Sequence, residues 1–127
     1  GKIYYELEEA RAERGLDDRV ALIRLEQLAP FPKKPLAGEL QRYPADAVYV
    51  WCQEEPRNMG AWFFVAPRIE DLLADLGRRY PRLAYAGRRP AAAPATGFIA
   101  QHEREQAELL AAAFEVGPGE RVGGDEG

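Results

Sequence analysis

Several residue types that carry chemistry are scarce in this chain of 127 residues, which has one cysteine, one histidine and one methionine. The single cysteine, Cys52, excludes a disulfide within the chain, and its apolar surroundings favour a small buried side chain over a nucleophile. A metal site needs three or four ligands, and the only histidine, His102, has no cysteine or aspartate at ligand spacing. We therefore expect no metal site in this chain.

Long apolar runs and a strong charge of one sign are also missing. No apolar stretch is long enough to cross a membrane, and no signal-peptide pattern stands at the start. The formal net charge is −4, so the overall balance gives no electrostatic footprint for nucleic acid. We expect neither a membrane nor a nucleic acid as a partner. The first residue is Gly1 rather than methionine, and we expect it to be an internal position of a longer chain.

What the chain does contain is an alternation of helix and strand patterns, with 46% apolar residues to form a core. The expected order is helix, strand, helix, strand, helix, strand, helix, over residues 2–14, 20–25, 35–43, 47–52, 62–76, 82–86 and 98–114. Such alternation predicts an α/β fold with a mostly parallel sheet and helices on both faces. Residues 115–127 are rich in glycine and acid, so we expect a folded domain over 1–114 and a flexible tail after it.

The clearest periodicity belongs to the helix expected over 62–76. Its apolar residues are spaced 3, 4, 3, 4 at Trp62, Val65, Ile69, Leu72 and Leu76, and Gly77 stands where a C-cap is needed. Pro67 lies inside the pattern. It predicts either a kink or the start of a second helical segment.

A polar segment, which we call the elbow (residues 53–58), follows the strand expected over 47–52. It contains Gln53, Glu54, Glu55, Pro56, Arg57 and Asn58. In parallel α/β sheets functional groups gather where strands end, but a structural βα loop has the same composition, and both interpretations stay open. On extended backbone Glu54 and Glu55 point to opposite sides, which favours positioning or interface roles over a shared-proton pair.

A second polar feature follows the third expected strand. Arg88 and Arg89 come directly after it, and Thr96 and Gly97 stand at the start of the last expected helix. Free amides at a helix start together with guanidinium groups form a site for phosphate or carboxylate. The alternative is that these arginines pair with glutamates of a partner.

Several motifs in this order resemble one known family. They are LEQL at 25–28 with PFP at 30–32, QEEP at 53–56 with NMGAW at 58–62, YAGR at 85–88 with PAAAPATG at 90–97, and His102 with Gln106. Together, over residues 1–114, they resemble the C-terminal domain of the decarboxylating component of 2-oxoglutarate dehydrogenases. That component is a member of the transketolase-like, thiamine diphosphate-dependent group.

The resemblance implies an oxidoreductase of the citric acid cycle that decarboxylates 2-oxoglutarate and succinylates the lipoyl group of dihydrolipoyl succinyltransferase. The family's Gly-Asp-Gly signature with a later Asn does not occur here. Thiamine diphosphate and magnesium are therefore expected outside this region, no catalytic residue is expected within it, and the isolated chain is expected to be inactive. The resemblance also implies a location in the bacterial cytoplasm or the mitochondrial matrix.

For this domain the resemblance implies a three-layer α/β/α unit that supports a homodimer and shapes the active-site entrance. The residues expected at that entrance or interface are Gln53, Glu54, Glu55, Arg57, Asn58 and His102. Because the family has an apolar strand just before the position of Lys2, we expect this sheet to lack its first strand or strands. Two alternatives stay open: a regulatory module that binds acetyl-CoA or AMP through Arg88 and Arg89, and a pure dimerisation domain.

Overall fold

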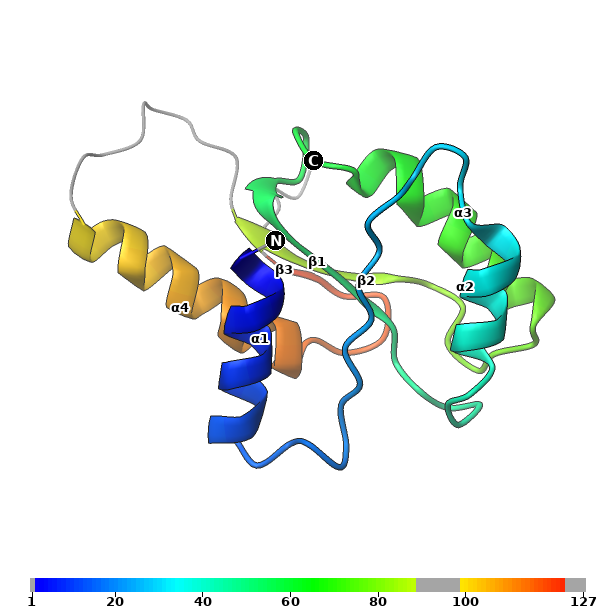
Figure 1. The fold of residues 1–127 in the computed structure, drawn as a ribbon, viewed down its shortest axis with the longest axis horizontal. Helices are drawn as coiled ribbons and strands as arrows, with labels where there is room; N and C mark the ends of the chain where they lie inside the picture. The colour runs from blue at the N-terminus through cyan, green and yellow to red at the C-terminus, as the bar shows by residue number, and fades with distance from the viewer. Residues whose placement is uncertain (1, 89–98, 123–127) are drawn as a thin grey trace.

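The computed structural model describes residues 2–88 and 99–122, in which two helices are followed by alternating strands and helices (Figure 1). In chain order the elements are α1 (Lys2–Glu13), α2 (Lys33–Leu40), β1 (Val50–Pro56), α3 (Trp62–Asp75), β2 (Ala84–Arg88), α4 (Ile99–Glu115) and β3 (Arg121–Val122). The strands form one sheet in the order β1-β2-β3, and both pairings are parallel. The expected α/β class with a parallel sheet is therefore confirmed.

The helices lie on both sides of this small sheet. In Figure 1, α1 and α4 lie on one side, and α2 and α3 lie on the other. The described sheet has three strands, and the three-layer, transketolase-like architecture stays a prediction.

Two glycines end their helices by the same mechanism. Gly15 and Gly77 have positive φ angles of 67° and 68°, a conformation that glycine adopts without a Cβ penalty. After α1, the amide of Leu16 donates to the carbonyl of Arg11, and after α3 the amide of Arg78 donates to the carbonyl of Leu73, each at 3.0 Å. These bonds satisfy carbonyls that a helix end leaves free, as in the Schellman motif.

The core is centred on α3 and β2. Trp62, Val65, Ile69 and Leu72 are buried as the periodicity predicts, while Leu76 is the C-cap and packs at the edge. The Trp62 ring meets the fully buried Tyr85 ring edge to face, with centroids 4.9 Å apart. α3 continues through Pro67, so neither a break nor a second segment occurs.

The strand expected over 20–25 does not form, and this prediction is wrong for the structure. The segment runs without a ladder partner among the described residues, and Ile23 remains 40% exposed. Its start is held by Val20, whose carbonyl accepts from the Arg11 guanidinium at 2.9 Å. An apolar, branched sequence favours extended backbone, but a strand also needs a neighbour to pair with, and no described strand pairs with this segment.

Two other strand boundaries differ from expectation. β1 begins at Val50 rather than at 47 and continues to Pro56, through most of the predicted elbow, because β2 runs alongside it as far as Arg88. The register shifts between Gln53 and Pro56, so this end of the strand is irregular. β2 lies two residues later than the strand predicted over 82–86.

Residues 116–122 lie within the predicted flexible tail over 115–127, and two of them pair with the sheet. Arg121 and Val122 form β3 beside β2, and the Tyr85 amide donates to the Glu120 carbonyl at 2.8 Å. A short, glycine-flanked segment gave no strand pattern, because two residues are too few to show a period.

Candidate functional site

The elbow is built around the side chain of Gln53, which is only 5% exposed. Its Oε1 accepts from the Trp51 indole at 2.8 Å, and its Nε2 donates to the carbonyls of Glu55 at 3.1 Å and Pro56 at 3.0 Å. A Cβ on Gly60 would lie 2.5 Å from Gln53 Nε2, so glycine is needed there. Gln53 therefore holds the elbow in place, and its amide is already used within the fold.

The two glutamates of the elbow have different surroundings, in agreement with the predicted alternation. Glu54 is partly buried and accepts a 3.5 Å hydrogen bond from Gln106 Nε2 of α4, which also donates to Glu6 of α1 at 2.6 Å. Glu55 is exposed. One amide thus links two carboxylates from α1 and β1, whereas Glu55 faces solvent, so the two glutamates of the elbow have separate surroundings.

The end of the elbow presents its side chains outward. The amides of Met59 and Gly60 both donate to the Pro56 carbonyl, at 2.9 and 3.3 Å, and close a turn. Asn58 and Met59 are exposed at this turn, and Arg57 is partly buried with interactions of its own. The turn therefore offers one amide and one thioether to any neighbouring molecule.

Tyr85 of β2 contacts the elbow from the neighbouring strand. Its hydroxyl donates to the Glu55 carbonyl at 3.4 Å, and a Cβ on Gly87 would lie 2.1 Å from that hydroxyl oxygen. Burial raises the pKa of Tyr85 to about 12, and a hydrogen bond with Gln53 opposes the rise in part. The phenol therefore stays protonated at neutral pH and remains a donor.

The sequence predicts that Cys52 is not a nucleophile and that the chain has no metal site. Burial, and then the nearby charge of Glu54, raise the pKa of the Cys52 thiol to about 12, so it remains protonated at neutral pH. Such a thiol is a poor nucleophile. Within residues 2–88 and 99–122, no group of three metal-ligating side chains comes together.

The expected anion site is only partly within the described structure. The backbone of Arg88 lies at the end of β2, opposite Pro56 of β1, and His102 belongs to α4, one turn before Gln106. Arg89, Thr96 and Gly97 lie outside the described residues, so an anion site formed by these residues stays a prediction.

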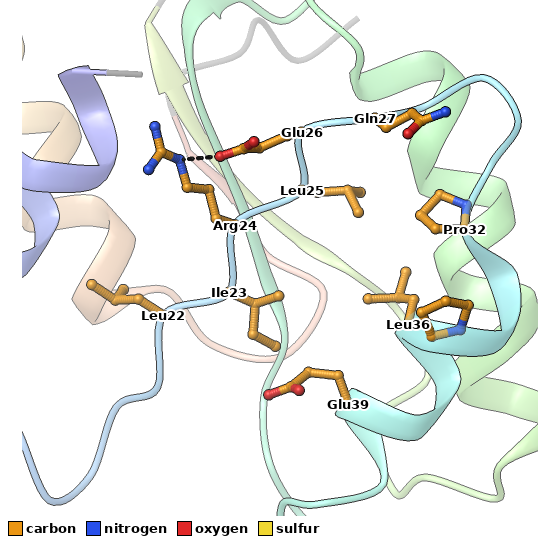
Figure 2. Close-up of a pocket in the computed structure, with 10 residues that line it drawn as sticks. Leu22, Ile23, Arg24, Leu25, Glu26, Gln27, Pro32, Leu36 and Glu39 are labelled. Atoms are coloured by element: carbon orange, nitrogen blue, oxygen red, sulfur yellow. Dashed lines mark ion pairs between the residues drawn. The ribbon is translucent and has the colours of Figure 1, made fainter.

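A groove that the sequence did not suggest lies between the 22–27 segment and α2. Its volume is about 470 Å³, and it is lined by Leu22, Ile23, Arg24, Leu25, Glu26, Gln27, Pro32, Pro35, Leu36 and Glu39. Figure 2 shows Ile23 and Leu25 directed toward α2, with Leu22 and Arg24 directed the other way. Arg24 pairs with Glu26 at 2.9 Å. The side chains alternate as in a strand, although the segment is unpaired.

Comparison with known proteins decides the family. A family described as "2-oxoglutarate dehydrogenase C-terminal" matches residues 1–114. The chain belongs to this family. It is 52% identical over 110 residues to the "2-oxoglutarate dehydrogenase E1 component" of Brucella anthropi, and equally to those of Brucella ovis and Brucella canis. Each match covers 87% of this chain but 11% of the relative.

The matched region contains nearly all of the described helices and strands. Every element up to α4 falls within it except the last residue of that helix, Glu115, while β3 follows it. Across the residues that the structure describes, no helix is long and apolar enough to span a membrane.

Proposed function

We propose that this chain is the C-terminal domain of a thiamine diphosphate-dependent enzyme that decarboxylates 2-oxoglutarate. That enzyme transfers the succinyl group to the lipoyl group of a dihydrolipoyl succinyltransferase in the citric acid cycle, in the bacterial cytoplasm. The observation that carries this proposal is the family match over 1–114, together with 52% identity to relatives that bear this enzyme's name. Because the chain spans 11% of those relatives, thiamine diphosphate and magnesium would be held by the rest of the polypeptide.

Within such an enzyme the elbow has the features of a positioning surface rather than of a catalytic centre. Gln53 is committed to three internal hydrogen bonds, and Glu54 is engaged by Gln106. The groups left outward are the Glu55 carboxylate and the Asn58 amide. These groups suit recognition at an entrance or at a dimer interface, where preorganised polar contacts contribute orientation.

Exposed apolar side chains beside the elbow support an interface on the same side. Met59 is 73% exposed and Phe63 is 63% exposed, at the turn and at the start of α3. Large apolar side chains exposed together are typical of surfaces that contact another chain or domain. A homodimer partner or the preceding domains of the same polypeptide would cover them.

The unpaired 20–25 segment supports the proposal that a further strand completes the sheet in the longer polypeptide. β1 has no partner on the side away from β2 among the described strands, and the side chains of residues 22–25 point alternately toward α2 and away from it (Figure 2). A strand from the preceding part of the chain would lie between them and satisfy backbone groups on both sides.

A regulatory role is the second candidate. The observation that favours it is the position of Arg88 at the carboxyl end of β2, next to the elbow, where ligands of parallel sheets bind. Acetyl-CoA and AMP each carry phosphates that Arg88 and Arg89 would bind. Calorimetric titration of the chain with each compound tests this role. A heat of binding that is lost in Arg88→Gln would support it.

The main proposal is tested by exchange of domains. The matched 110 residues of the Brucella anthropi enzyme are replaced by the corresponding residues of this chain. We expect the hybrid to decarboxylate 2-oxoglutarate and to succinylate the lipoyl partner, and we expect the 127-residue chain alone to show no turnover with thiamine diphosphate and magnesium. A well-folded hybrid without activity, or turnover by the chain alone, would overturn the proposal.

A further inference from the structure

The segment that follows the family match contacts the candidate site through the core. We call residues 116–122 the strap. Its turn is closed by the Gly117 amide, which donates to the Glu120 carboxylate at 2.7 Å, and by the Glu120 amide, which donates to the Gly117 carbonyl at 3.1 Å. Gly119 has a φ of 71° in this turn, and a Cβ there would lie 3.2 Å from Arg82 Cβ. The turn over residues 117–120 is therefore fixed by its own hydrogen bonds, and β3 follows it directly.

The principal anchor of the strap is Arg121. Its Nη2 pairs with Glu70 Oε2 at 3.2 Å, and its guanidinium carbon lies 4.9 Å from the centroid of the Trp62 ring. Both partners in the ion pair are 29% exposed, so solvent screens them less than it screens a surface pair. The same Glu70 oxygen accepts from the Leu83 amide at 2.9 Å, which ties α3 to the start of β2.

From this anchor an unbroken series of contacts leads to the elbow. Arg121 covers Trp62, the Trp62 ring packs on Tyr85, and the Tyr85 hydroxyl donates to the Glu55 carbonyl. The strap also holds Tyr85 directly, because the Tyr85 amide donates to Glu120. Arg57 of the elbow is close enough to contribute, after burial and Arg82, to a lowered pKa of Arg121.

We propose that the strap is a positioning device that fixes the elbow, with Arg121 acting through Trp62 and Tyr85. The proposal goes beyond the proposed function and does not depend on it, because it concerns the order of the elbow in this chain. Packed side chains with few alternative arrangements transmit such coupling between contiguous residues.

The experiment is hydrogen exchange of the 127-residue chain with and without Arg121→Gln. The reporters are the Met59 and Gly60 amides, which are bonded to the Pro56 carbonyl. We expect them to exchange about 3- to 30-fold faster in the variant, while amides of α2 keep their rates. Arg121→Lys keeps the charge but loses the guanidinium that lies over the Trp62 ring, so its exchange rates should fall between those of the unchanged chain and those of Arg121→Gln.

Arg14→Gln is the matched control. Arg14 also makes a 3.2 Å ion pair, with Glu115, and lies 5.6 Å from the Phe114 ring centroid, but in the described part of the chain no aromatic series links it to the elbow. Glu70→Gln is the milder second variant if Arg121→Gln fails to fold, because it keeps an acceptor for Leu83. Unchanged elbow exchange in a folded strap variant, a uniform acceleration of all amides, or an equal effect of Arg14→Gln would overturn the proposal.

Discussion

Two short stretches of this chain differ in sequence, and the less strand-like of them is the one that pairs in the sheet. Residues 20–25 (VALIRL) are the more strand-like, with branched side chains, yet they remain unpaired. Residues 84–88 (AYAGR) contain two alanines and a glycine, yet they form β2, the central strand of the described sheet. The difference is that β2 has β1 on one side and β3 on the other, so a strand in this fold depends on its neighbours more than on its propensity.

The largest expected effect comes from removing the aromatic support of β2. Trp62→Ala empties the space against the Tyr85 ring and should lower the free energy of unfolding by about 3–5 kcal/mol, as truncation of large core aromatics does. Phe63→Ala is the control, because that side chain is 63% exposed, and it should change stability by less than about 1 kcal/mol. Denaturant melts measure both. A small loss in Trp62→Ala would mean that this ring is not a core support.

A smaller effect is expected from adding one methyl group to β2. Gly87→Ala places a Cβ 2.1 Å from the buried Tyr85 hydroxyl, and such overpacking should destabilise by about 1–3 kcal/mol. Gly38→Ala in α2 meets nothing within 4 Å and should stabilise by up to about 1 kcal/mol. Thermal melts of the two variants should move in opposite directions; a shift in the same direction would contradict the tight fit at Gly87.

Shortening a side chain within residues 20–25 should have little effect on the stability of the chain alone. Ile23 is 40% exposed, so Ile23→Ala should cost less than about 1 kcal/mol. In the hybrid with the upstream domains, where we propose a neighbouring strand, the same change should cost about 1–3 kcal/mol. Equal costs in both contexts would argue that no strand is added beside residues 20–25.

The mildest test uses pH. The pKa values of Cys52 and Tyr85 are raised to about 12, so the folded chain holds these protons where the unfolded chain has lost them. Stability should therefore be complete below about pH 8.5, the ordinary cysteine pKa, and should fall as the pH rises toward 12. Cys52→Ala should delay the onset of this fall toward the ordinary tyrosine pKa of about 10. An identical alkaline profile for the variant would contradict the burial of the thiol.

Much of the α2–α3 side of the fold follows from local pattern. The 3, 4, 3, 4 spacing places Trp62, Val65, Ile69 and Leu72 in the core, and Gly77 ends α3 where the sequence predicts. The opposite directions of Glu54 and Glu55 also follow from the period of a strand. These features depend on residues a few positions apart, which is the range in which sequence periodicity carries information.

The rest depends on contacts between distant residues. Gln53 looks like a polar loop residue, and its burial follows from the Trp51 indole, the Gly60 backbone and the carbonyls of its own turn. Arg121 contacts Glu70 across 51 positions, and two residues of β3 give no period to detect. The missing pairing of 20–25 likewise reflects what lies beside the segment, which its own residues do not encode.

The strand order β1-β2-β3 follows the direction of synthesis, and this has a consequence for how the chain is made. Trp62 leaves the ribosome long before Arg121, and the roughly 60 residues between them take about 3–12 seconds to translate at about 5–20 residues per second. During that interval the nascent chain can close α3 onto β1, and later onto β2, while one edge of β2 and one face of the indole still meet water. Arg121 and Val122 thus complete a core that was begun about 60 residues earlier in the chain, and a chaperone that binds exposed apolar surface would act during that interval.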